Sequence, residues 1–117
     1  TAEDPDGPQK EDPFLRRFRD MVEKELANPD FSVPKLCKEI GMSHTQLHRK
    51  LKATTGMSAI QLIKSIRMER AKTLLEDTDL SIGEIAYQTG YNDPSYFGRV
   101  FAKYTGKPPS NYRDEAF

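Results

Sequence analysis

The chain contains two copies of one sequence pattern, and this internal repeat restricts its fold more than any other feature. Residues 32–41 (SVPKLCKEIG) align with residues 81–90 (SIGEIAYQTG) at an offset of 49. Beyond the final glycines the offset becomes 50, and four further pairs of residues match. These pairs are Leu47 with Phe97, Arg49 with Arg99, Leu51 with Phe101, and Gly56 with Gly106. A repeat of this period indicates one supersecondary unit that occurs twice.

Each copy has the residues that begin and end two short helices. A serine, Ser32 or Ser81, is placed to cap the first helix, and Ser81 with Glu84 predicts a capping box. Gly41 or Gly90 then supplies the left-handed residue that ends the helix. A second cap follows, predicted as Ser43 with Gln46 in the first copy and Asp93 with Pro94 in the second. The pattern predicts helix-turn-helix units at residues 32–55 and 81–105.

The remaining segments predict further helices, which gives an all-α fold of about seven helices. Residues 58–77 contain no glycine or proline and predict a long linker helix between the two units, about 30 Å long. Its buried face is expected to comprise Ile60, Ile63, Ile66, Ala71 and Leu74. A helix from Pro13, capped by Asp12, is expected to end at Asn28-Pro29. Its predicted buried stripe comprises Phe14, Leu15, Phe18, Met21, Val22 and Leu26. Residues 108–115 predict a short closing helix, so that the folded domain covers residues 13–117.

The net charge of zero hides an uneven distribution of charge. Residues 1–13 carry a net charge of −4 and residues 31–53 a net charge of +4. We interpret residues 1–12, which also contain two prolines and a glycine, as an acidic flexible linker. The chain begins with threonine, which suggests a segment of a larger protein. The lone Cys37 and the lack of an apolar run of about 18 residues favour a cytoplasmic location without membrane contact by this segment.

Several motifs together resemble the signature of AraC/XylS-type transcription regulators. They are SIGEIA at residues 81–86, GYNDPSYF at 90–97, RVF at 99–101, GKPPSNYR at 106–113, IR at 66–67 and AKTLL at 71–75. The resemblance covers residues 14–113. The lead-in DPFL at 12–15 and RKLK at 49–52 resemble the version found at the C-terminus of bacterial hybrid two-component regulators. The resemblance implies promoter binding and, usually, activation of transcription through contact with RNA polymerase.

The resemblance also implies which residues face DNA, since the second helix of each unit would lie in the major groove. The implied base-facing residues are Thr45, His48 and Arg49 in the first unit, and Ser95, Tyr96 and Arg99 in the second. In the second unit, Pro94 and Gly98 also match base-facing positions, but their side chains cannot form hydrogen bonds. Candidate phosphate contacts are Ser43, His44, Lys50, Lys52, Lys103 and Lys107. An arginine can donate two hydrogen bonds to the O6 and N7 atoms of guanine.

Other interpretations of these residues remain open at this point. His44 and His48 have a spacing that can bind zinc, but a third ligand is missing nearby, so we expect no metal and no cofactor. No arrangement of residues typical of an enzyme occurs, and no small-molecule ligand is expected. Arg67 and Arg70 on the long helix fit buried ion pairs with partners such as Glu69 as well as DNA contact. The main alternative function is a helical protein–protein interaction module.

Overall fold

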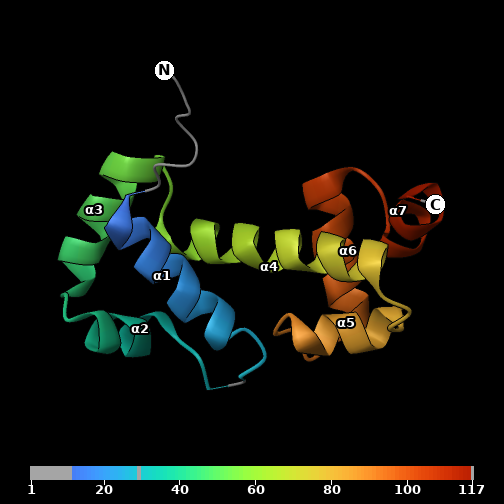
Figure 1. Cartoon of the computed structure of the whole chain (residues 1–117), viewed down its shortest axis with the longest axis horizontal. Helices are drawn as coiled ribbons and strands as arrows, with labels where there is room; N and C mark the ends of the chain where they lie inside the picture. Colours follow the sequence, from blue (N-terminus) through green and yellow to red (C-terminus); the bar gives the residue numbers. More distant parts are fainter. Residues whose placement is uncertain (1–11, 29, 117) are drawn as a thin grey trace.

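The computed structural model describes residues 12–28 and 30–116, and all regular structure in this part of the chain is helical. The helices are α1 (Pro13–Lys24), α2 (Val33–Ile40), α3 (His44–Thr55), α4 (Ala59–Asp77), α5 (Ile82–Gln88), α6 (Pro94–Thr105) and α7 (Pro109–Ala116). Helix α4 crosses the centre of the molecule, with α1–α3 around its first half and α5–α7 around its second half (Figure 1). The predicted all-α fold, with two helix-turn-helix units joined by a long helix, is confirmed.

The molecule has two separate hydrophobic cores, which define two units. In the N-terminal unit, α1, α2 and α3 pack on the first half of α4; in the C-terminal unit, α5, α6 and α7 pack on its second half. Fully buried residues of the first core include Phe18, Val22, Leu36, Leu47 and Leu51. Those of the second core include Met68, Leu75, Ile85, Phe97 and Phe101. Each unit therefore buries its own apolar surface and uses α4 as a shared wall.

Helix α4 is apolar on two different sides, which corrects the expectation of a single buried face. Its first half buries Ala59, Leu62, Ile63 and Ile66 in the N-terminal unit, and its second half buries Met68, Ala71, Leu74 and Leu75 in the C-terminal unit. At 3.6 residues per turn these two sets lie on different sides of the helix. Ile60 belongs to neither set and is 71% exposed, so the prediction that it is buried was wrong.

The predicted caps are confirmed at both units. Ser43 with Gln46 and Ser81 with Glu84 both form complete capping boxes, and the Asp93 side chain accepts a hydrogen bond from the backbone of Ser95. The backbone nitrogen of Ser81 donates to Glu84, and this bond lowers the pKa of the Glu84 carboxyl. Gly41 and Gly90 have φ angles of 78° and 93°, as the left-handed turn requires.

Helix α1 ends four residues before the predicted boundary. Its last helical residue is Lys24, and the chain then tightens, since the backbone nitrogens of Leu26 and Asn28 donate to the carbonyls three residues earlier. This tighter winding turns Leu26 into the core, where it is 5% exposed. The α-helix therefore ends before Asn28, and tightened turns follow it up to Phe31.

The repeat extends further along the chain than the sequence alignment indicates. Thr55 Oγ1 donates to the Leu51 carbonyl at 2.7 Å, and Thr105 Oγ1 donates to the Phe101 carbonyl at 2.9 Å. Each of these threonines also accepts a hydrogen bond from the backbone nitrogen two residues later. The next helices, α4 and α7, then begin at equivalent places, so α7 supports the C-terminal unit as the start of α4 supports the N-terminal one.

Candidate nucleic-acid interface

Helices α3 and α6 each present one side to the core and the other to solvent. Leu47 and Leu51 anchor α3, and Phe97 and Phe101 occupy the equivalent positions on α6; none of the four exceeds 1% exposure. The ring centroids of Phe97 and Phe101 lie 5.8 Å apart, and Tyr91 and Tyr112 contact them on either side. These anchors fix which residues of α3 and α6 face outward. We call α3 and α6 the reading helices.

The predicted base-facing residues all lie on the outward sides of the reading helices. Thr45, His48 and Arg49 on α3, and Ser95, Tyr96 and Arg99 on α6, are exposed. Pro94 and Gly98 are partly buried. The two arginines stand at equivalent places on the two helices, since each follows its helix's N-cap by six residues.

On α6, two of the predicted base-facing residues contact each other. The guanidinium carbon of Arg99 lies 5.7 Å from the centroid of the Tyr96 ring, within the range of a cation–π contact. Tyr96 in turn lies 6.0 Å, centroid to centroid, from Tyr91. The Tyr96 contact favours conformations in which the Arg99 guanidinium lies over the ring. A pre-ordered arginine loses less conformational entropy on binding than a free one.

The predicted phosphate contacts have different local partners. The Lys50 ammonium lies 5.0 Å from the centroid of the Phe14 ring, and Lys52 Nζ is 3.4 Å from the carbonyl of Gly56, at the end of α3. Lys103 is exposed on α6. Lys107 forms an ion pair with Glu115, which competes with a phosphate contact. Ser43 and His44 are exposed at the start of α3, where the Ser43 hydroxyl accepts a hydrogen bond from the backbone nitrogen of Gln46.

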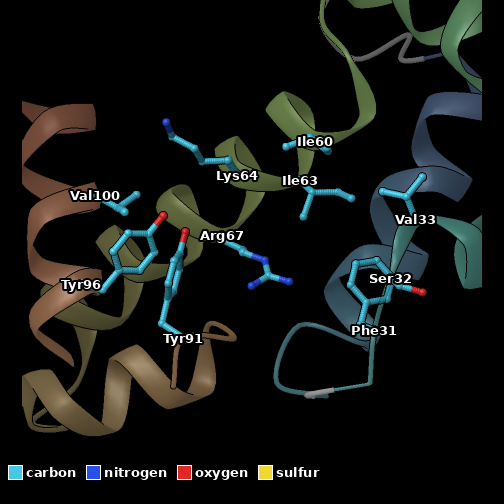
Figure 2. Close-up of a pocket in the computed structure, with 10 residues that line it drawn as sticks. All are labelled: Phe31, Ser32, Val33, Ile60, Ile63, Lys64, Arg67, Tyr91, Tyr96 and Val100. Carbon is cyan, nitrogen blue, oxygen red and sulfur yellow. The ribbon is translucent and has the colours of Figure 1, made fainter. Parts of the chain in front are cut away.

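A groove of about 320 Å³ separates the two units along α4, and we call it the inter-unit groove. One wall carries Tyr91, Tyr96 and Val100 of the C-terminal unit, and the other carries Phe31, Ser32 and Val33 of the N-terminal unit (Figure 2). Ile60, Ile63, Lys64 and Arg67 of α4 lie between the walls. The sequence did not identify Lys64 or Tyr91 as part of this surface, because the signal depends on how the two units are placed around α4.

Arg67 does not form the ion pair with Glu69 that was one of its two predicted roles. Its Nη1 atom donates to the carbonyl of Gly90 at 3.1 Å, and its guanidinium carbon lies 5.6 Å from the centroid of the Tyr91 ring. Glu69 instead pairs with Lys72, and it accepts a hydrogen bond from the Tyr104 hydroxyl. Burial raises the pKa of the Tyr91 hydroxyl, and the nearby charge of Arg67 partly opposes this effect.

Other features of the described residues concern metal binding, cysteine chemistry and membrane spanning. Among residues 12–28 and 30–116, no three histidine, cysteine, aspartate or glutamate side chains come together as metal ligands would. Cys37 is a buried free thiol. None of the helices in the same part of the chain has the length and apolar character needed to cross a membrane.

Comparisons with known proteins agree on one family. A family model described as a helix-turn-helix domain matches residues 36–115. Histidine kinase P4 of Formosa agariphila is 37% identical over 101 residues, which is 86% of this chain but 7% of that protein. This chain therefore corresponds to a small part of that relative.

Two solved structures share the fold at high similarity. The C-terminal domain of AraT, a response regulator from Geobacillus stearothermophilus, has a TM-score of 0.80 and 35% identity, covering 91% of this chain and 88% of that one. The DNA-binding domain of AdpA, a global transcriptional factor solved in complex with a target DNA, has a TM-score of 0.78 and 27% identity, covering 89% and 92%. The chain belongs to the AraC-type family of helix-turn-helix domains, which bind DNA and regulate transcription.

Proposed function

We propose that one copy of this chain binds two neighbouring major-groove segments of double-stranded DNA, with α3 in one segment and α6 in the next. The observation that carries this proposal is the matched pair of exposed arginines, Arg49 and Arg99, on two helices with the same buried anchors. A guanidinium on the outward face of a helix can donate two hydrogen bonds to one guanine. Equivalent placement in both units supports one reading role, performed twice.

The two units are proposed to read DNA differently. In the first, Arg49, His48 and Thr45 offer a charged donor, an imidazole, and a hydroxyl with a methyl group. In the second, Arg99 and Ser95 lie beside the Tyr96 ring, while Pro94 and Gly98 lack polar side-chain atoms. The first unit should therefore distinguish more base positions. The second should depend more on phosphate contacts, which position the protein without reading sequence.

We further propose that the chain is the output domain of a larger, signal-responsive regulator that works in the cytoplasm. The likeness to a response-regulator C-terminal domain and to a small part of a histidine kinase supports this role. Activation would then follow from contact between the promoter-bound domain and RNA polymerase. In vitro transcription from a promoter carrying the selected site, with and without the chain, tests this part separately.

The DNA proposal is tested by selecting a binding site from random duplexes and measuring the dissociation constant across a salt series. If about six to ten phosphates are contacted, the logarithm of the association constant should fall against the logarithm of salt concentration with a slope of about −5 to −9. The Arg49→Ala, Arg99→Ala double variant should lose the preference for the selected site over scrambled DNA. The Lys24→Ala, Lys38→Ala double variant removes two exposed charges from α1 and α2, which are not reading helices, and is the matched control.

The test also separates DNA binding from the alternative of a protein–protein module. If selection enriches no sequence and the residual affinity shows no dependence on salt, the DNA proposal is wrong. Loss of affinity in the control variant equal to that in the arginine double variant would show that total charge, and not the two reading arginines, determines binding.

A further inference from the structure

The two units touch at a junction in the middle of α4, where the helix passes from one core to the other. Ile66 belongs to the first core and Met68 to the second, so Arg67 stands at the boundary between them. Its guanidinium reaches the C-terminal unit through the Gly90 carbonyl, at 3.1 Å, and the Tyr91 ring. Figure 2 shows this side chain projecting from α4 between Tyr91 and Phe31.

The turn of the C-terminal unit that contains Gly90 lies against the N-terminal unit. A Cβ atom added to Gly90 would lie 2.4 Å from Arg67 Nη1 and 2.5 Å from the carbonyl oxygen of Leu26, which follows α1. Gly90 is thus enclosed between α4 and the end of the first unit's opening helix. The equivalent glycine of the first unit, Gly41, has no atom within 4 Å of its added Cβ. The close packing is therefore specific to the place where the units meet, and it is not required by the helix-turn-helix itself.

Placing an arginine at this boundary costs free energy, because part of its polar side chain is buried. Its Nε atom is buried and has no hydrogen-bond partner within the described structure. Burial of this donor removes its hydration, which is a cost that an apolar side chain would not have at this position. What the arginine adds is a directional bond from α4 to the turn of the second unit. The bond thus holds the turn at Gly90, which also lies against the Leu26 carbonyl of the first unit.

We propose that the junction of Arg67, Gly90 and Leu26 sets the distance and angle between the reading helices, and so determines the spacing of DNA segments that one chain binds together. Outside the junction, the open inter-unit groove separates the walls of the two units. A change in angle at the junction is magnified at the reading helices, which lie at opposite ends of α4 (Figure 1). The part that concerns DNA rests on the proposed function, and Arg67 acts in it as a positioning residue.

The geometric part can be tested without DNA. Spin labels at Ala53→Cys on α3 and Lys103→Cys on α6 occupy equivalent exposed positions, in a Cys37→Ala background that removes the buried thiol. Pulsed electron paramagnetic resonance should give a narrow distribution of distances between the two spin labels in this parent. Arg67→Met should broaden or shift the distribution. Arg67→Lys keeps the charge and one donor nitrogen, so its distribution should lie between those of Arg67→Met and the parent. Lys72→Met, which removes a surface ion pair on the same helix, should leave the distribution unchanged.

The DNA part uses selected sites in which the two segments are moved together or apart by one and two base pairs. The unsubstituted chain, which is the parent for all DNA measurements, should prefer one spacing by about tenfold, because a rigid body engages both segments only when the geometry fits. Arg67→Met should reduce this preference to about twofold while its affinity for each isolated segment stays unchanged. Thermal unfolding measurements check that the variants are folded. If Arg67→Met does not fold, Arg67→Lys is compared with the parent instead. It should lose some of the spacing preference, but less than is expected for Arg67→Met.

The outcomes separate this inference from the proposed function. An unchanged distance distribution together with an unchanged spacing preference in the Arg67 variants would overturn the inference while leaving DNA binding intact. Equal weakening at every spacing and on isolated segments would also overturn it, because that result describes general damage. If the parent binds no DNA, the proposed function fails, and the distance distributions alone decide whether the junction holds the units in place.

Discussion

Arg49 is the residue whose role in sequence recognition can be tested most directly. It is exposed on the outward side of α3, one helical turn before Lys52, whose ammonium lies at the carbonyl end of the same helix. Arg49→Ala should cost about 1–3 kcal/mol on the selected site and relax the preference at one base position. Lys52→Ala, if the lysine meets only phosphate, should weaken binding to all sequences about equally. Affinities for the selected site, its single-base variants and scrambled DNA measure both effects.

The two substitutions serve as controls for each other, because each removes one positive charge from the same helix. A uniform loss of affinity in both variants would show that Arg49 does not read a base. Arg99→Ala should resemble Arg49→Ala with a smaller loss of preference, since its neighbours Pro94 and Gly98 add no polar contacts.

At the residue scale, exposure on the reading helices agreed with the sequence, except at Pro94 and Gly98, whereas contact partners could not be predicted. The six base-facing candidates with polar side chains, which the family resemblance implied, are all exposed, and the buried leucine and phenylalanine anchors lie on the opposite side of each helix. The contacts of Lys107 with Glu115 and of Arg67 with Gly90 join residues that are far apart on the helices or in the chain. Such contacts depend on how helices pack, and no local pattern encodes them.

Among the elements, the short helix α7 contacts the end of α4 through one arginine and one tyrosine. Arg113 Nε donates to the Leu75 carbonyl and its Nη2 donates to the Thr78 carbonyl, both at 3.1 Å. These two bonds occupy carbonyls that the end of α4 would otherwise leave without partners. Arg113→Ala should therefore lower the free energy of unfolding by about 2 kcal/mol, given the usual strength of charged hydrogen bonds at partly buried sites. Urea denaturation measures the change.

The neighbouring Asp114 provides the comparison for this effect. It is exposed on the same helix, so Asp114→Ala should change stability by less than about 0.5 kcal/mol. Similar losses in the two variants would mean that α7 contributes through its helicity, and that the contacts to α4 are unimportant.

A second contact between α7 and α4 predicts a dependence on alkaline pH. The Tyr112 hydroxyl donates to Glu76, and this bond, helped by burial, raises the pKa of Tyr112 from 10.0 to about 12. Because the pKa is higher in the folded state, the stabilisation is fully present below pH 10 and is lost as the pH rises through 12. The free energy of unfolding should fall over this range less steeply in Tyr112→Phe than in the parent.

Tyr87→Phe, at a tyrosine that is 55% exposed, provides the control and should keep the slope of the parent. Denaturation at fixed pH steps gives the free energies, and absorbance of the tyrosinate form follows the titration directly. Equal slopes in all three proteins would show that the Tyr112 contact does not contribute to stability.

The elements themselves show where local rules succeed and where they fail. Caps and turn glycines were predictable, because a serine cap or a glycine with positive φ satisfies needs of a few adjacent residues. The two-sided burial of α4 was not, because its halves serve different cores. Each half alone shows a helical period, and a single stripe fitted through both placed Ile60 wrongly in the core.

At the scale of the whole molecule, the two cores and the shared helix form a body with a fixed span. Helix α4 has 19 residues, which corresponds to about 28 Å, somewhat less than one turn of B-DNA at about 34–36 Å. It contains neither glycine nor proline, and both of its apolar sides are covered by the units. A helix committed in this way has no hinge of its own, so with the Arg67 junction intact the reading helices cannot follow a change in the DNA.

This rigidity predicts how binding responds to insertions between the two DNA segments. Five added base pairs move the second segment by about 17 Å and rotate it by roughly half a turn, so affinity should fall to that of one unit alone. Ten added base pairs restore the face of the duplex but not the distance, and should rescue little. A flexible tether would instead follow either displacement at modest entropic cost. Footprinting on the three duplexes should show two protected segments only without an insertion, and equal affinity for all three would mean that one unit does all the reading.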